Sequence, residues 1–171
     1  IQTSTDGISW TETSISIYYP SRGLTFGNGT FVVWSETFVN SGNYVCHILS
    51  SSDGINWTSR TNPEDNTWKD IAWSPELTLF AAVSADGTNR VMTSPDGITW
   101  TARAAAAANS WNGITWSAEL GIFCAVSLDG VGNRIMISSD GINWTTETPS
   151  IDNSWDGVAW SPELYKFCAV G

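Results

Sequence analysis

One short phrase occurs four times in this chain of 171 residues, and its spacing limits the possible folds more than any other feature. Its general form is Ser-x-Asp-Gly-Ile-x-Trp-Thr, and its aspartates are Asp6, Asp53, Asp96 and Asp140. The steps between these aspartates are 47, 43 and 44 residues. A repeat of this length indicates units that bury their apolar faces against one another. The chain is therefore predicted to consist of repeated units.

Each unit is predicted to contain four short strands. In the third unit a turn of the Ser-Pro-Glu-Leu type, here with Ala in place of Pro, follows strand one. The apolar run 122–127 is too short for a helix and predicts strand two. A loop at 128–133 leads to strand three at 134–138, and strand four begins near Trp144. The five alanines at 104–108 are predicted to form a compact linker, because isolated helices that short are unstable in water.

The Asp-Gly pair predicts a tight turn between strands three and four. Asp can accept hydrogen bonds from backbone N–H groups two residues further on, and Gly supplies the positive φ that such a turn requires. The Trp four residues after the Asp is expected to pack back over the hairpin. Identical residues in four copies cannot all occupy one active site, so we interpret the phrase as structural.

Four strands in about 44 residues are typical of a β-propeller blade. Residues 156–171 match strands one and two, and the N-terminal residues match strands three and four. We therefore predict an all-β fold, a β-propeller of four antiparallel four-stranded blades, with a mixed closing blade formed by the two termini. The predicted units of this single domain, 1–171, are 15–58, 59–101, 102–145, and 146–171 completed by 1–14. Closure would hide two sheet edges.

Two alternatives stay open at the level of the sequence. A window taken from a longer array of repeats would also begin and end in the same loop. Two such chains could also assemble into a larger ring.

Composition argues against several functions. The formal net charge is −10 with seven Lys and Arg residues, so nucleic acid is not an expected partner. No stretch approaches the roughly 20 apolar residues that span a bilayer, so membrane insertion is not expected either. Three cysteines without a CxxC pair, and one histidine, do not form a zinc-binding pattern. We expect no metal and no cofactor.

Two of the cysteines, Cys124 and Cys168, occupy equivalent positions in strand two. Other units carry Val32 and Ala81 there. Both cysteines are therefore predicted to be small buried apolar side chains. A disulfide between Cys124 and Cys168 would require the blades to approach closely at that level.

The phrase at 94–101, Ser-Pro-Asp-Gly-Ile-Thr-Trp-Thr, resembles the Asp-box, or bacterial neuraminidase repeat, of β-propeller proteins. The Asp-box usually has a further residue between Asp and Gly, which this chain lacks. The whole unit is more similar to tandem repeats of phage tail or fibre proteins and of bacterial surface proteins. This resemblance implies an extracellular or virion-surface location. Asp-box propellers include glycosidases, sugar-binding modules and scaffolds, so the fold alone does not define an activity.

For a sialidase-like glycoside hydrolase, the resemblance implies three arginines around a substrate carboxylate, a Tyr/Glu nucleophile pair and an acidic Asp. The five arginines of the chain are Arg22, Arg60, Arg90, Arg103 and Arg134. Arg90 and Arg134 are equivalent in the repeat, and Glu76, Glu119 and Glu163 all fall in the turn after strand one. Glycoside hydrolysis needs two carboxyl groups in distinct environments, whereas repeated residues share one. We expect no enzymatic activity, and the hydrolase is the less favoured alternative.

A glycan-binding, adhesive module is the favoured interpretation. An Asn-x-Trp segment leads into strand one in three units. An aromatic ring can cover the C–H face of a sugar, and an amide can hydrogen-bond its hydroxyl groups. The predicted ligand-binding residues are Asn66, Trp68, Asn109, Trp111, Asn153 and Trp155. The alternative is that these Trp rings wedge between adjacent blades. The expected partners are cell-surface glycans or, for a purely structural scaffold, copies of the chain itself or neighbouring fibre proteins.

Overall fold

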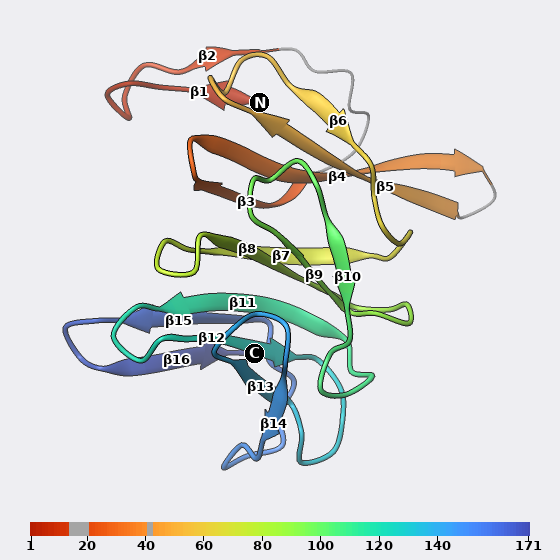
Figure 1. Cartoon of the computed structure of the whole chain (residues 1–171), viewed down its shortest axis with the longest axis vertical. Coiled ribbons are helices and arrows are strands. Elements are labelled where there is room, and N and C mark those ends of the chain that lie inside the picture. The colour runs from red at the N-terminus through yellow and green to blue at the C-terminus, as the bar shows by residue number, and fades with distance from the viewer. Residues whose placement is uncertain (14–20, 41–42) are drawn as a thin grey trace.

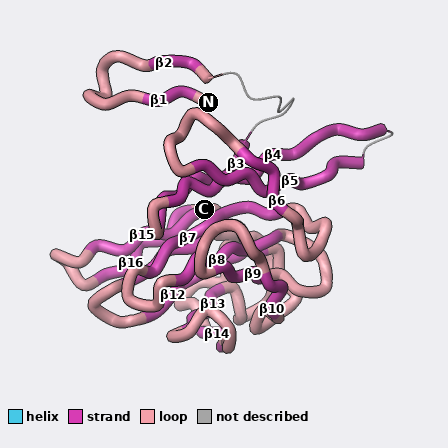
Figure 2. Tube along the Cα trace, turned by 45° about the horizontal axis from the view of Figure 1, so that its top comes forward, coloured by secondary structure: helices cyan, strands magenta, loops and turns pink. Residues whose placement is uncertain are grey.

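The computed structural model describes residues 1–13, 21–40 and 43–171, and all regular secondary structure among them is β-strand (Figures 1 and 2). Within these residues, three sheets have four antiparallel strands in sequential order, and two sheets have two strands. The predicted unit 15–58 begins outside the described residues, and only the backbone of Arg22 is described. No helix in the described part of the chain is long and apolar enough to cross a membrane.

The three complete sheets are the blades of the fold. The first blade contains β3 (Ser21–Gly27), β4 (Thr30–Asn40), β5 (Asn43–Ser51) and β6 (Thr58–Arg60). The second contains β7 (Trp68–Ser74), β8 (Leu79–Ser84), β9 (Val91–Ser94) and β10 (Thr101–Arg103). The third contains β11 (Trp111–Ser117), β12 (Ile122–Ser127), β13 (Ile135–Ser138) and β14 (Thr145–Glu147). The two-stranded sheets are β1 (Gln2–Thr3) with β2 (Thr11–Glu12), and β15 (Gly157–Ser161) with β16 (Lys166–Val170).

The strands of the third blade confirm the predicted unit. Strand β12 covers the predicted 122–127, β13 begins one residue after the predicted start, and β14 follows Trp144 directly. The alanine linker contains no helix, and Ala105–Ala107 pack against a buried cluster instead. Small side chains allow the connection between two blades to lie close to that cluster.

Successive blades pack through their first strands. Strand β7 lies against β3, β11 against β7, and β15 against β11. The first buried cluster joins Trp34 of one blade to Ile71 and Phe80 of the next. The second joins Val83 to Phe123 in the same way. Because burial of a large apolar side chain contributes roughly 1.5–3 kcal/mol, contacts between blades are a major part of the stability.

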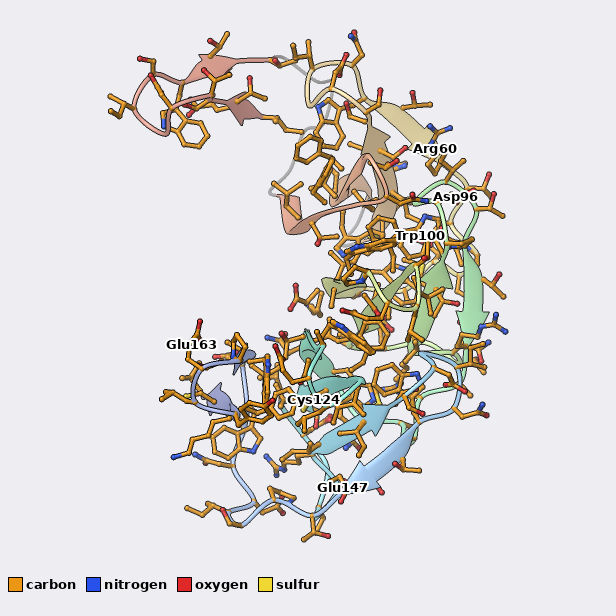
Figure 3. The ribbon with its side chains drawn as sticks, turned by 60° about the vertical axis from the view of Figure 1, so that its left-hand side comes forward. Arg60, Asp96, Trp100, Cys124, Glu147 and Glu163 are labelled. Carbon is orange, nitrogen blue, oxygen red and sulfur yellow. The ribbon has the colours of Figure 1, made fainter. Side chains whose placement is uncertain are left out.

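The two ends of the chain do not form the mixed closing blade that the sequence predicted. The β1–β2 and β15–β16 hairpins are present at the expected residues, but they belong to separate sheets. Packing through the first strands arranges the blades along an open arc, with the two hairpins at its opposite ends (Figures 1 and 3). In Figure 3, Glu163 marks the turn between β15 and β16 beside the open side of this arc. The blades are confirmed, and the correction concerns the pairing that would complete the ring.

The cysteines show how position along the arc decides burial. Cys124 is buried in the third blade, and this burial raises the pKa of its thiol to about 12. Cys168 occupies the equivalent position in β16 and is exposed, which corrects the prediction of a buried side chain. Both residues are described, and no disulfide joins them. Among the described residues, no further blade covers β16 on the face that carries Cys168.

Candidate functional site

The Asp-Gly turns have the predicted hydrogen bonds. In the third blade, one carboxylate oxygen of Asp140 accepts the backbone N–H groups of Ile142 and Asn143, both at 2.8 Å. Ser138 Oγ donates to the same oxygen at 3.0 Å and accepts the backbone N–H of Gly141 at 2.8 Å. Gly141 has φ 71°, a conformation that costs glycine little and other residues more.

These hydrogen bonds keep the repeated aspartates ionised. Backbone N–H donation by Ser9 and Ile8 lowers the pKa of Asp6 to about 2. Burial raises the pKa of Asp140, but donation from Asn143 and Ile142 outweighs it and brings the value to about 2. A general acid needs a pKa near the working pH, so these carboxyl groups serve the turn rather than proton transfer.

The repeated glutamates of the turn after strand one bind the next blade. Trp116 Nε1 donates to Glu76 Oε2 at 2.7 Å, and Trp160 Nε1 donates to Glu119 Oε2 at 2.7 Å. Glu163 is the third copy, and its described contact is a 3.2 Å hydrogen bond from Ser161 Oγ. Glu76 and Glu119 thus form hydrogen-bonded links between blades, and within the described residues Glu163 does not.

The repeated arginines bind their own loops. Arg90 donates through Nε to Gly87 O and through Nη1 to Ala85 O, at 3.2 and 3.1 Å. Arg134 makes the equivalent bonds to Gly130 O and Leu128 O, at 2.8 and 3.2 Å. Both guanidinium groups therefore stabilise the loop between strands two and three.

The first predicted sugar-binding pair, Asn66 and Trp68, is buried. Asn66 Nδ2 donates to the backbone oxygen of Asn89 at 2.7 Å, which fastens the start of strand one to the loop before strand three. Trp68 Nε1 donates to Glu64 O at 3.3 Å. A Cβ at Gly87 would lie 2.0 Å from Asn66 Oδ1, so the loop can approach this amide closely only with glycine there.

The second pair repeats this arrangement. Asn109 Nδ2 donates to Asn133 O at 2.8 Å, and Trp111 Nε1 donates to Ala107 O at 3.0 Å. Both Trp rings are fully buried within the inter-blade clusters. The structure therefore corrects the assignment of Asn66, Trp68 and their two equivalents as accessible sugar contacts, because their polar atoms and rings already serve the fold.

The third pair lies at the end of the arc and differs from the other two. Asn153 is exposed and Trp155 is half-buried. Within the described part of the chain, Trp155 Nε1 has no hydrogen-bond partner. Of the three copies, only this one has an exposed amide and a Trp ring that is not fully buried, although Nε1 of that ring is itself buried.

A site that the sequence did not predict lies between the first two blades, where the indole of Trp100 differs from its equivalents. Trp10, Trp57 and Trp144 each donate Nε1 to the glycine oxygen of their own Asp-Gly turn. Trp100 is almost fully buried, with its ring 5.3 Å from that of Trp34, and its Nε1 has no partner among the described residues. A buried donor of this kind is unusual and needs an explanation.

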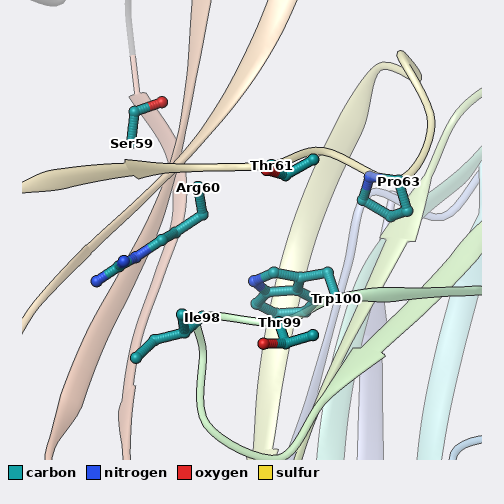
Figure 4. A pocket seen from close by; sticks show the side chains of 7 residues that line it. All are labelled: Ser59, Arg60, Thr61, Pro63, Ile98, Thr99 and Trp100. Atoms are coloured by element: carbon teal, nitrogen blue, oxygen red, sulfur yellow. The ribbon is translucent and has the colours of Figure 1, made fainter.

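Trp100 forms one wall of a cavity of about 420 Å³ (Figure 4). Strand β6 and the segment after it form the facing wall. The cavity is lined by Ser59, Arg60, Thr61, Pro63, Ile98, Thr99 and Trp100. Arg60 Nε donates to Ser50 Oγ at 2.7 Å, which fixes the guanidinium while its two Nη atoms bind no described residue. The cavity thus combines a cation, hydroxyl groups and an aromatic wall.

The repeat contains a weak signal for this cavity. Arg103 is equivalent to Arg60, and its Nε donates to Thr93 Oγ1 at 3.2 Å. After Arg60 the linker is polar and contains Pro63, whereas after Arg103 it is the alanine run that packs on the core. A difference between repeats, rather than a repeated motif, would have indicated this site.

Comparisons with known proteins support the fold. No family model and no curated protein match the chain. A chain from the crystal structure of a nidogen/laminin complex is 14% identical with a TM-score of 0.61, covering 88% of this chain and 56% of that one. A Bacteroides thetaiotaomicron protein of unknown function is 10% identical with a TM-score of 0.64, covering 91% of this chain and 40% of that one.

The fold and these similarities define the chain as an all-β protein of the β-propeller type. At these identities the similarity concerns the fold alone. The chain spans about half the length, or less, of both chains.

Proposed function

We propose that this chain is a non-catalytic β-propeller module of an extracellular or virion surface, and that the cavity between β6 and the β9–β10 turn binds a glycan. The observation that carries the proposal is the lining of this cavity. Ile98 and the Trp100 ring offer apolar surface, which suits the C–H faces of a sugar, and Ser59, Thr61 and Thr99 offer hydroxyl groups. Ligand sites typically combine apolar and aromatic surface with polar groups that fix the orientation of the ligand.

Arg60 indicates the class of sugar. It is the one charged residue among the seven that line the cavity, and its Nη atoms are not engaged by the described residues. A guanidinium binds a carboxylate through two parallel hydrogen bonds. We therefore propose an acidic glycan, such as one with a uronic or sialic acid, as the ligand.

The absence of catalysis is part of the proposal. Glu76 and Glu119 bind Trp side chains of the next blade, and Arg90 and Arg134 bind loop carbonyls. These engaged groups argue against two carboxyl groups free for glycoside hydrolysis.

Glycan-array binding with two matched variants tests the proposal. Arg60→Ala is expected to reduce binding of carboxylated glycans by about 10-fold or more, since a charge-assisted hydrogen bond contributes roughly 1.5–3 kcal/mol. Arg103→Ala removes the equivalent residue beside the alanine linker and is expected to leave binding unchanged. Absence of glycan binding by the parent chain, or equal losses in the two variants, would contradict the proposal.

The sequence-based prediction for Asn153 and Trp155 needs its own variant. A triple Trp68, Trp111 and Trp155 replacement would remove two buried core rings and lower stability along with any binding. Trp155→Ala alone tests the accessible copy. Loss of binding in Trp155→Ala, with Arg60→Ala unaffected, would move the sugar site to the end of the arc.

A further inference from the structure

The two ends of the arc present complementary halves of one blade. The β15–β16 hairpin corresponds to strands one and two, since Ser161 to Lys166 enclose the same turn as Ser117 to Ile122. The β1–β2 hairpin corresponds to strands three and four, since it encloses the Asp6-Gly7 turn. Together the hairpins contain each strand position of a blade once.

Each hairpin also has an unpaired edge. In the complete blades strand two pairs with strand three, as Cys124 pairs with Ile137 in the third blade. Within the described residues, β16 pairs only with β15 and β1 only with β2. An unpaired strand edge is a template for another strand. By repeat equivalence Cys168 would lie opposite Thr3, and Phe167 opposite Ser4.

The apolar faces at the two ends match as well. Ala159, Cys168 and Val170 are exposed on β15–β16, whereas their equivalents Ala72, Ala81 and Val83 are buried in the second cluster. That cluster packs these residues against the next blade, which supplies Ile114 and Phe123.

The residue equivalent to Ile114 in the first blade is Leu24, which pairs with Val33 as Ile114 pairs with Ala125. Leu24 is 62% exposed and Ile114 is 4% exposed. The exposed face around Leu24 on β3 therefore corresponds to the surface against which Val83 packs. Val170, the equivalent of Val83, could pack against it in the same way.

The space between the N-terminal hairpin and the first blade has room for the missing strands. Between the second and third blades, a Cβ at Gly141 would lie 3.6 Å from Thr93 Cγ2. The equivalent distance between the N-terminal hairpin and the first blade, from a Cβ at Gly54 to Thr3 Cγ2, is 3.2 Å. The β1–β2 hairpin therefore already occupies the position of the outer half of a preceding blade. A hollow of about 580 Å³, lined in part by Leu24 and Phe31, lies beside it.

The chain's own β15–β16 hairpin lies at the other end of the arc, beyond three complete blades (Figures 1 and 3). Moving it to β1 would require new angles at packed interfaces between blades. The chain also superposes on parts of longer chains, with TM-scores of 0.61 and 0.64, so its curvature fits a segment of a larger arrangement.

We propose that the β15–β16 hairpin of one copy of this chain inserts between β1–β2 and β3 of a second copy, so that β16 pairs with β1 across the two molecules. Three complete blades and one shared blade from each copy then give eight blades, within the range of roughly four to eight that is usual for propellers. A head-to-tail contact of this kind forms a closed ring when its rotation permits.

Sedimentation equilibrium in about 0.15 M salt, which screens the charge of −10 on each copy, tests the association. The expected species is a concentration-dependent dimer with twice the 18.5 kDa mass of the chain. Leu24→Asp places an unpaired carboxylate in the proposed interface between the two copies and is expected to weaken association by on the order of 100-fold or more. Val131→Asp, on an exposed loop, is the matched control and is expected to associate as the parent does.

A disulfide tests the register. Thr3→Cys faces the native Cys168 in the proposed pairing, so mild oxidation is expected to yield a covalent dimer on a non-reducing gel. Thr11→Cys, one strand further away, is expected to yield none. A chain that stays monomeric at all concentrations, a disulfide between the introduced thiol and Cys168 of the same molecule, or a dimer insensitive to Leu24→Asp would each overturn the proposal. Glycan binding by Arg60 is independent of all three results.

Discussion

The middle of the arc and its two ends contain equivalent residues in different environments. Val126 in the third blade is 1% exposed, whereas its equivalent Val170 in β16 is 62% exposed. Trp100 in the second blade is 8% exposed, and its equivalent Trp10 in the N-terminal turn is 58% exposed. The backbone hydrogen bonds that the aspartate carboxylate accepts are nevertheless the same at Asp6 and Asp96.

This difference separates two levels of structure. Turn geometry depends on residues within one phrase, so it persists where a blade is incomplete. Burial depends on the neighbouring blade, so it is lost at the ends even where the sequence is unchanged. Stability in a repeat protein is accordingly a sum of terms within units and terms between neighbours.

The largest expected effect compares Phe123 with Phe167. Phe123→Ala removes a fully buried ring from the second cluster and is expected to lower the free energy of unfolding by about 3–5 kcal/mol. Phe167→Ala removes the equivalent half-buried ring and is expected to cost less than half as much. Denaturant titration of both variants provides the measurement. Equal losses would show that burial at the end of the arc is as complete as in the middle.

A smaller effect is expected for the hydrogen bonds that link Glu76 and Glu119 to the next blade. Glu76→Ala removes the acceptor of Trp116 Nε1, and we expect a loss of about 0.5–1.5 kcal/mol in the free energy of unfolding. Glu163→Ala changes the same turn where no Trp of a following blade is bound and is expected to be nearly neutral. Thermal unfolding compares the two variants, and a larger loss for Glu163→Ala would contradict the assignment.

The smallest effect is a dependence on pH. The folded-state pKa of Asp140, about 2, lies below the ordinary value of 3.8, so its stabilising contribution is present above about pH 4 and is lost as pH falls toward 2. Asp140→Asn is expected to reduce the slope of stability against pH in this window.

Asp70 is expected to act in the opposite direction. Burial raises its pKa, despite hydrogen bonds from the backbone N–H groups of Ile114 and Ile71, so its contribution favours the folded state at low pH and is lost as pH rises through the folded-state value. Asp70→Asn should therefore steepen the acid-induced loss of stability, measured by denaturant midpoints between about pH 2 and 5. A shallower slope in Asp70→Asn would contradict this sign.

Much of the blade could be predicted from the sequence because its signals are local. The Asp-Gly turn and the short apolar run determine where strands begin and end, and β12 covers the predicted residues. Exposure of Cys168 could not be predicted in this way, because it depends on what packs across β16.

The proposed ligand site shows a second limit of prediction from the sequence. The repeated Asn-x-Trp segments indicated function, yet Asn66 and Asn109 bind loop carbonyls within the fold. The cavity instead depends on one linker that differs between otherwise equivalent units. Arg60 and Trp100 themselves lie at repeated positions, so a search for repeated motifs does not single them out.

If a second copy covers the ends of the arc, as proposed, β16 gains a partner strand only on association. Hydrogen exchange of the β16 segment, followed by mass spectrometry over a range of protein concentrations, measures this gain. We predict fast exchange in dilute solution and protection approaching that of β12 once the chain associates. Exchange in β16 that stays fast at every concentration, or is equally slow at every concentration, would contradict pairing of β16 with a second copy.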